Sequence, residues 1–366
     1  MLTRQVLFMI FAFIVSFTFT FATTPLVRRF AFKIGAIDIP KDNRRMHKKP
    51  TPRIGGLAII FGFTVATLCF AQPSRQLYGT LAGAAIIAVM GVIDDCKNLP
   101  AKLKFVIQII AALVVVFAGD IKIDVFTNPN FLSDNPYWVL PEWLSVTLTV
   151  IWIVFITNAV NFIDGLDGLA AGVSAIMSIS LVFISIRVGE YSIAILGIAL
   201  MGSCFGFLPF NFNPAKIFMG DSGSMFLGYI IAVIALLGFK NVTLTSFIIP
   251  ILLLAIPILD TLFAILRRLI NHKPLGEPDK NHLHHQLLKL KLSQKKTVII
   301  IYIVDLLFAS ASIVYAVGNS MLGSNIYGMV IYAILFVLIL LLILKTNIIW
   351  NHDKKKEKTK EETKEK

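Results

Sequence analysis

Five groups of polar residues interrupt an otherwise apolar chain, and each lies where an apolar stretch meets a loop. They are a pair of aspartates, an Asn/Asp series with glycines, a Gly-Asp-Ser-Gly turn, an aspartate followed by paired arginines, and a histidine cluster. In order, they occupy residues 94–95, 158–169, 211–224, 260–268 and 282–285. Carboxylates, amides and histidines at membrane depth are costly to keep and usually mark function. Together, these residue types predict metal-dependent phosphate chemistry at a membrane face.

The Gly220-Asp221-Ser222-Gly223 turn leads into an apolar run and carries the strongest local signal. A helix that begins here would present free backbone amides and a positive dipole to a phosphate. The Asp221 carboxylate beside it could hold magnesium. The alternative is that Asp221 only caps the helix, but a cap alone does not require two flanking glycines.

An Asn/Asp series repeats every three residues, which places neighbouring members on nearly the same face of a helix. Its members are Asn158, Asn161, Asp164 and Asp167. The alternative is a hydrogen-bonded polar seam between helices, although two carboxylates in such a seam are unusual. Gly165 and Gly168 would let the backbone open or a ligand come close.

Two other segments combine charges in ways that suit phosphate binding. Asp94 and Asp95 would repel each other unless a cation or a basic phosphate ligand joins them; the alternative is a solvated pair at a helix end. The segment 47–56 places Lys48 and further cations beside prolines and paired glycines. It suits an anion grip and equally a basic cytoplasmic loop.

Near the C-terminal end of the predicted site, Asp260 lies about two turns before Arg267 and Arg268, where a structural ion pair is the alternative. A cluster of three histidines could donate hydrogen bonds to a diphosphate; they are His282, His284 and His285. A zinc site there would lack a cysteine and a clear fourth ligand. The three cysteines of the chain are scattered singly among apolar residues, which indicates neither disulfides nor a metal site.

The composition places these groups in a membrane. Of 366 residues, 57% are hydrophobic and only 15% are charged, and the mean hydropathy is +0.80. Such a chain cannot cover a soluble globule with polar surface. We therefore expect an all-α polytopic membrane protein.

Eleven stretches are candidates for the roughly 20-residue helices that cross about 30 Å of hydrocarbon. They cover residues 5–24, 54–71, 77–93, 104–118, 143–163, 165–186, 191–209, 223–239, 244–266, 297–317 and 325–344. The fourth is short, so the bilayer must thin there or Lys104 must snorkel to the interface. The first is expected to be an uncleaved helix with its N-terminus outside, because one basic residue precedes it and nine follow between Arg28 and Arg53.

Alternation from that start places every second loop in the cytoplasm, and these loops carry 29 of the 34 Lys and Arg residues. The net charge of +13 therefore reflects topology and attraction to anionic lipid and substrate, with no need for nucleic acid. The same alternation brings all five polar groups to the cytoplasmic side, which predicts a single site. A transporter would instead hold its ionisable residues near the bilayer midplane, and a passive scaffold would need no Asp-rich constellation.

From Lys48 to the eleventh span, these motifs and their order resemble the polyprenyl-phosphate N-acetylhexosamine-1-phosphate transferases, glycosyltransferase family 4. The matching residues are Asp94 and Asp95 for its paired aspartates, Asn158, Asn161, Asp164 and Asp167 for its Asn and Asp-Gly motif, and Asn211 and Asp221 for its nucleotide and magnesium motif. The histidine loop is similar to the bacterial branch that uses UDP-GlcNAc. The muramoyl-pentapeptide branch typically has three consecutive histidines, where this chain has Leu283, and an arginine where it has Lys280.

The resemblance implies that GlcNAc-1-phosphate passes from UDP-GlcNAc to undecaprenyl or another polyprenyl phosphate, with release of UMP. This step would begin a cell-envelope polymer such as teichoic acid or O-antigen. Catalytic roles are implied for Asp94, Asp95, Asp164, Asp167, His284 and His285, and substrate binding for Lys48, Asn158, Asn161, Asn211, Asp260, Arg267, Arg268 and His282. The implied cofactor is Mg²⁺ on Asp221, with Mn²⁺ as a substitute.

The expected organisation is a membrane-embedded transferase domain over residues 1–350, in the bacterial plasma membrane, with its active site in the cytoplasm. Residues 351–366 form a Lys/Glu-rich run that is expected to be a disordered cytoplasmic tail on the lipid surface. Relatives of this family suggest a homodimer. Two alternatives stay open: a phospho-MurNAc-pentapeptide transferase, and a membrane transporter from a different class.

Overall fold

The computed structural model describes residues 2–40, 50–127, 137–239, 250–271 and 282–321, together with residues 330, 334 and 337. Within this part the chain is mostly helical. The helices are α1 (Leu2–Ile34), α2 (Gly56–Phe70), α3 (Arg75–Lys97), α4 (Ala101–Phe117), α5 (Glu142–Ile163), α6 (Leu169–Arg187), α7 (Tyr191–Asn211), α8 (Gly220–Phe239), α10 (Ala255–Ile270), α11 (Leu283–Lys289) and α12 (Gln294–Met321). Two antiparallel hairpins complete it, β1 (Ile37–Asp38) with β2 (Thr51–Pro52) and β3 (Val125–Thr127) with β4 (Tyr137–Val139).

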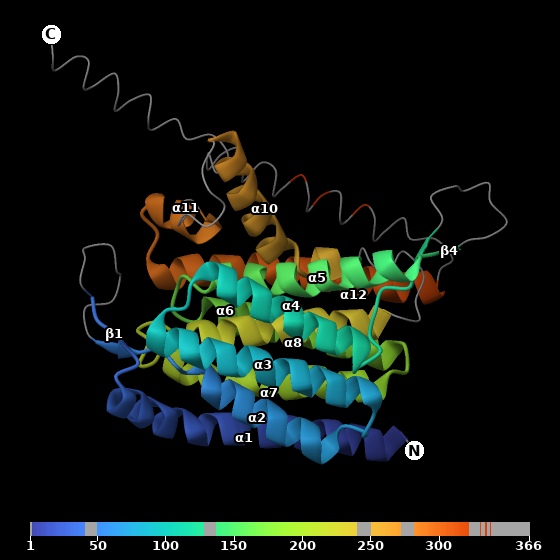
Figure 1. Cartoon of the computed structure of the whole chain (residues 1–366), viewed down its shortest axis with the longest axis horizontal. Helices are drawn as coiled ribbons and strands as arrows, with labels where there is room; N and C mark the ends of the chain where they lie inside the picture. Colours follow the sequence, from blue (N-terminus) through green and yellow to red (C-terminus); the bar gives the residue numbers. More distant parts are fainter. Residues whose placement is uncertain are drawn as a thin grey trace, which may run out of the picture.

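The long helices lie side by side in one bundle (Figure 1). The central helix is α8, which packs against α2, α3, α5, α6 and α7, and its side chains from Met225 to Ala235 are buried. In contrast, α10 leaves the bundle at a steep angle. The hairpin β1–β2 and the helix α11 lie at the left-hand end of the bundle in Figure 1, and β4 lies at the opposite end.

Two glycine contacts allow three helices to meet at the N-terminus of α8. Gly91 of α3 lies against the backbone of Ser222, and Gly56 of α2 lies against Gly223. A side chain at either glycine would collide with the α8 backbone. The two pairs therefore fix the start of α8, and with it Asp221, against α2 and α3.

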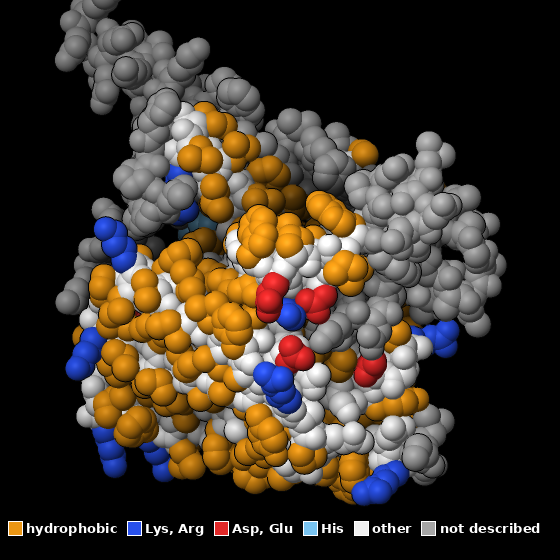
Figure 2. Space-filling model, turned by 45° about the vertical axis from the view of Figure 1, so that its right-hand side comes forward, with side chains coloured by type: hydrophobic (Ala, Val, Ile, Leu, Met, Phe, Trp, Pro, Cys, Tyr) orange, Lys and Arg blue, Asp and Glu red, His pale blue; other side chains and the backbone are white. Residues whose placement is uncertain are grey.

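Among the described residues, seven helices are long and apolar enough to cross a membrane, namely α1, α3, α5, α6, α7, α8 and α12. Figure 2 shows hydrophobic side chains spread over much of one face of the bundle, with Lys and Arg along its edges and, near the centre, beside a group of Asp and Glu side chains. A monomeric soluble protein rarely exposes so large an apolar surface. The prediction of a helical multi-pass membrane protein is confirmed.

The count of eleven spans and the orientation of the N-terminus stay predictions. The helices α2 and α4 match the second and fourth predicted spans but are short, with 15 and 17 residues. The predicted span 244–266 differs from the described helix α10, which extends to Ile270 and has charged residues on its buried side. The eleventh span, 325–344, lies outside the described residues except for 330, 334 and 337.

Candidate active site

Segments from most of the predicted polar groups meet in one cavity of about 810 Å³ at the end of the bundle near β1 and α11. Its lining comes from the β1–β2 hairpin, the α3–α4, α5–α6 and α7–α8 junctions, α11 and the start of α12. The polar lining residues include Asp38, Arg53, Asp94, Asp95, Asn98, Lys104, Asn161, Asp164, Asp167, Asn211, Asn213, Asp221, His285 and Gln294. Helix packing thus gathers groups that are far apart in sequence.

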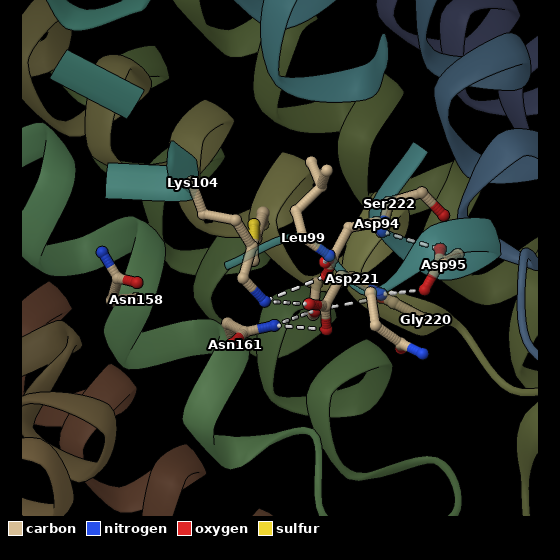
Figure 3. A network of polar contacts seen from close by, with 12 residues as sticks. Asp94, Asp95, Leu99, Lys104, Asn158, Asn161, Gly220, Asp221 and Ser222 are labelled. Carbon is tan, nitrogen blue, oxygen red and sulfur yellow. Dashed lines mark hydrogen bonds and ion pairs between the residues drawn. The ribbon is translucent and has the colours of Figure 1, made fainter. Parts of the chain in front are cut away.

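Asp221, the predicted metal ligand, stands at the first turn of α8 within a network of polar contacts (Figure 3). The Lys104 ammonium lies 3.0 Å from Asp221 Oδ2 and 3.0 Å from Asp94 Oδ2, so one cation bridges the two carboxylates. Asn161 Nδ2 donates to Asp221 Oδ1 at 3.1 Å and to Ser224 Oγ at 2.8 Å. Asp94 also accepts the Leu99 backbone N–H at 2.6 Å.

Lys104 has a different role from the one that the sequence indicated. The helix α4 begins at Ala101, and the Lys104 ammonium contacts Asp94 and Asp221 in the cavity lining. The short span had drawn attention to Lys104 only as a membrane anchor. The sequence does contain a signal for this contact. Lys104 lies one turn into an apolar helix and close in sequence to Asp94 and Asp95, and a lysine in such a place commonly pairs with carboxylates.

Asp95 lies beside Asp94 but contacts a different element. Its Oδ1 accepts the Asp221 backbone N–H at 2.9 Å and its Oδ2 accepts the Ser222 N–H at 3.0 Å. These are orphan amides at the start of α8, and a carboxylate there also meets the positive end of the helix dipole. The Asp95 side chain is thus a cap supplied by α3.

Asp164 and Asp167 flank Gly165-Leu166 at the α5–α6 junction and also differ in their contacts. Asp167 Oδ2 accepts hydrogen bonds from Asn213 Nδ2 at 2.8 Å and from the Ala215 N–H at 3.0 Å, which anchors the α7–α8 loop. Withdrawal from solvent, reinforced by nearby carboxylates, raises the pKa of Asp164 to about 8. The ionised form of Asp164 is therefore favoured by a cation in the cavity.

The three asparagines of the predicted site divide between the cavity and its support. Asn211 accepts the Gly168 N–H at 3.1 Å and donates to the Ile217 carbonyl at 3.0 Å, so it ties the α5–α6 and α7–α8 loops together. Asn158 lies outside the cavity lining and pairs with Gln108 of α4 at 2.6 Å. The three-residue spacing places Asn158 on the same helix face as Asn161. In the structure Asn158 lies about one turn deeper in the bundle, away from the cavity lining.

Asp260 lies outside the cavity lining, and its predicted contact with substrate stays a prediction. Its Oδ2 lies 2.8 Å from His282 Nδ1, and its Oδ1 accepts the Leu283 N–H at 2.7 Å. Its side chain is 3% exposed, so Asp260 attaches the start of α11 to α10. Arg267 and Arg268 of α10 are likewise buried and lie outside the lining.

Of the predicted histidines, only His285 reaches the cavity lining. The buried His284 lies against Gly165, where a Cβ would collide with its ring, so this glycine admits an imidazole rather than a ligand. Burial, with a smaller contribution from His285, lowers the pKa of His284 to about 3. His284 is therefore neutral near pH 7. Lys48 lies outside the described residues.

The donor set of the cavity fits magnesium. Six aspartates line the cavity, and the Lys and Arg residues among its described lining are Arg53 and Lys104. A diphosphate would therefore meet an excess of negative charge. The described residues form no cluster of three His, Cys, Asp or Glu side chains around one metal position. Magnesium is usually held by one or two carboxylates together with waters and substrate phosphates, and Asp221 supplies such a carboxylate in the cavity lining.

Known proteins resemble this chain over most of its length. Residues 77–239 match the model of glycosyl transferase family 4. A probable undecaprenyl-phosphate N-acetylglucosaminyl 1-phosphate transferase of Bacillus subtilis is 45% identical over 316 residues, which are 86% of this chain and 87% of the relative. A decaprenyl-phosphate N-acetylglucosaminephosphotransferase of Mycobacterium tuberculosis is 38% identical over 77% of this chain and 76% of its own length.

A third relative comes from the muramoyl branch. The phospho-N-acetylmuramoyl-pentapeptide-transferase of Moorella thermoacetica is 32% identical over 68% of this chain and 80% of its own length. The resemblance predicted from the motifs is therefore confirmed. The chain belongs to glycosyl transferase family 4.

Proposed function

We propose that this protein transfers GlcNAc-1-phosphate from UDP-GlcNAc to a polyprenyl phosphate and releases UMP. The 45% identity over 86% of the chain to a relative named for this transfer carries the proposal. The two compared relatives named for GlcNAc transfer are 45% and 38% identical to this chain, whereas the compared relative named for pentapeptide transfer is 32% identical. This difference favours UDP-GlcNAc over the UDP-MurNAc-pentapeptide alternative.

The reaction forms one phosphorus–oxygen bond and breaks another. A phosphate oxygen of the lipid attacks the β-phosphorus of UDP-GlcNAc, and the bond from that phosphorus to the bridging oxygen breaks, so that UMP leaves with the electron pair. A phosphate monoester has a second pKa near 6 and is largely a dianion at pH 7. The nucleophile therefore needs positioning and charge neutralisation more than it needs a base.

The residues of the cavity suit that task. Lys104 and Asn161 orient the Asp221 carboxylate, which would hold Mg²⁺; the ion, when bound, supplies positive charge beside the diphosphate. Asp95 holds the start of α8 in place, and Asp167 and Asn211 hold the loops around it. His285 lines the cavity and would donate a hydrogen bond to a phosphate oxygen.

The proposal includes a setting. The cavity would face the cytoplasm of a bacterium, since most basic residues are on loops assigned to that side, and the lipid phosphate would enter from the inner leaflet. The product would begin an envelope polymer such as teichoic acid or O-antigen. Mn²⁺ as a substitute for Mg²⁺ and assembly as a homodimer are further parts of the proposal.

One assay tests this function. Purified protein in detergent receives UDP-GlcNAc, undecaprenyl phosphate and Mg²⁺, and UMP release is measured; reactions without the lipid and with EDTA serve as controls. We expect lipid-dependent and metal-dependent UMP release, with far slower turnover of UDP-MurNAc-pentapeptide. Preference for the pentapeptide donor would assign the chain to the other branch, and no UMP release from either donor would refute the proposal.

A further inference from the structure

Arg53, which follows β2, directs its side chain onto the C-terminal end of α3. Its Nε donates to the Asp95 carbonyl at 2.9 Å, and its Nη2 donates to the Asp94 carbonyl at 3.2 Å and to Asn98 Oδ1 at 2.8 Å. Its Nε also lies 3.8 Å from Asp95 Oδ1. The sequence of segment 47–56 suits either anion binding or a basic cytoplasmic loop. The contacts of the Arg53 side chain indicate a different role for this residue.

The Arg53 side chain caps the C-terminal end of α3. The last carbonyls of a helix lack partners within it and carry the negative end of its dipole. The planar guanidinium can satisfy several of these acceptors at once. Without it the Asp95 carbonyl would lose the Arg53 Nε donor, and the Asp94 carbonyl would keep the N–H of the C-cap Asn98 at 2.8 Å.

The backbone around Arg53 holds the other half of the site. The Pro52 carbonyl accepts the Phe218 N–H at 2.7 Å, the Gly55 N–H donates to the Phe218 carbonyl at 2.9 Å, and the Gly56 N–H donates to Met219 at 2.8 Å. Gly220 (φ +73°) lies against both the Arg53 carbonyl and the Asp95 carboxylate, with no space for a Cβ. One short segment thus joins the end of α3 to the turn before Asp221.

We infer that Arg53 is a positioning residue for the proposed transfer, on which this inference rests. By holding the end of α3 against the turn before α8, it sets the distance between Asp94 and Asp221. Three of the five guanidinium N–H groups point at α3 and Asn98, and only those on Nη1 remain for another partner. An arginine that mainly bound the diphosphate would instead direct most of its guanidinium N–H groups into the cavity.

Kinetics of Arg53→Lys test this role, because lysine keeps the charge but cannot span three acceptors. We expect kcat to fall between about 10-fold and 10²-fold, the scale of a small misplacement of reacting groups, with the KM for UDP-GlcNAc changed less than about threefold. A raised KM at preserved kcat would show that Arg53 binds substrate directly and would overturn the inference. Wild-type turnover in the same assay separates this failure from a failure of the proposed function.

A double-mutant cycle adds a second criterion. Asn98→Gly removes the Oδ1 acceptor but tolerates the left-handed backbone at this position (φ +50°). If Arg53 acts through the end of α3, Asn98→Gly should cost little further turnover in the Arg53→Lys background. Independent, multiplying losses would refute action through α3.

A matched control and a spectroscopic probe exclude a merely structural effect. Arg75 makes the same kind of contact at the end of α4, where Nε donates to the Ala118 carbonyl at 3.0 Å and Nη2 to Phe117 at 2.7 Å, so Arg75→Lys should keep turnover. A nitroxide on the exposed Cys96, in a Cys69→Ser background with Cys204 buried, reports the last turn of α3. Arg53→Lys should increase its mobility and Arg75→Lys should not; equal spectra in all three proteins would contradict the inference.

Discussion

Asp95 caps the helix that carries Asp221, since its Oδ1 accepts the Asp221 backbone N–H at 2.9 Å. The neighbouring Asp94 instead shares the Lys104 ammonium with the Asp221 side chain. Two adjacent aspartates of α3 therefore hold the same residue in two ways, one through its backbone and one through a shared cation. The repulsion expected from the pair is relieved because each carboxylate has a different partner.

A first prediction separates these two roles. Asp95→Asn should lower the stability of the protein in detergent by about 1–2 kcal/mol, because asparagine has one acceptor oxygen for two backbone N–H groups, and should also reduce turnover because Asp221 moves with the start of α8. Ser74→Ala is the matched control, since Ser74 Oγ accepts the Leu77 N–H at 3.1 Å as the cap of α3, away from the site. It should lose similar stability and keep turnover; a stable Asp95→Asn protein would show that the cap is dispensable.

The helices were largely predictable because apolar runs end at charges or turn residues. The predicted spans 143–163 and 191–209 correspond to α5 (Glu142–Ile163) and α7 (Tyr191–Asn211). The convergence of the polar groups followed from their common position at helix ends. The roles assigned to the individual residues stay predictions.

The partners of individual side chains could not be predicted, because they depend on which element packs opposite. Nothing local distinguishes Asp95, which meets backbone amides of α8, from Asp94, which meets a lysine. Substrate binding by Asp260 is implied by the family resemblance, and an ion pair with Arg267 and Arg268 is the structural alternative. In the structure Asp260 contacts the start of α11, a partner that neither interpretation includes.

A second prediction concerns Lys104. Lys104→Met should lower turnover at least about 10²-fold, because Asp94 and Asp221 then face each other without the ammonium. Lys102→Met, at an exposed position on the same helix, is the control and should stay close to wild type. Thermal melts should show a larger stabilisation by Mg²⁺ in Lys104→Met than in wild type, since the repulsion makes added positive charge more favourable. An equal Mg²⁺ effect in both proteins would place the ion elsewhere.

A third prediction follows from the pKa of His284, about 3 in the folded protein against about 6.5 in an unfolded chain. As pH falls below about 6.5 the unfolded chain takes up the proton first, so stability present at neutral pH is lost. Between pH 6.5 and pH 5 the loss from this group is about 2 kcal/mol. The melting temperature of wild type should therefore fall more between pH 7.5 and pH 5 than that of His284→Gln. Parallel pH profiles would mean that His284 titrates normally.

A fourth prediction tests the sidedness of the cavity. In a background without Cys69 and Cys96, cysteines placed at Lys216 and Lys289 should react with an impermeant thiol reagent only from the cytoplasmic side. A cysteine at Lys122, in the segment between α4 and β3, should react only from outside. If Lys216 and Lys289 were labelled from opposite sides, the α7–α8 loop and α11 could not border one cavity.

The last prediction concerns Asp221, whose carboxylate stands between Lys104 and Asn161 at the start of α8. Asp221→Asn keeps the size of the side chain and one acceptor oxygen but removes the negative charge that a hard cation requires. Turnover should fall at least about 10²-fold, and Mg²⁺ should no longer strengthen UDP-GlcNAc binding, while the protein still folds and inserts into membranes.

Asp94→Asn is the comparison for this prediction, because the Asp94 carboxylate shares the same ammonium. This variant should lower turnover and leave Mg²⁺-dependent nucleotide binding largely intact. If Asp221→Asn kept turnover near wild type with an unchanged Mg²⁺ requirement, the metal would have to lie among Asp94, Asp95 and Asp164.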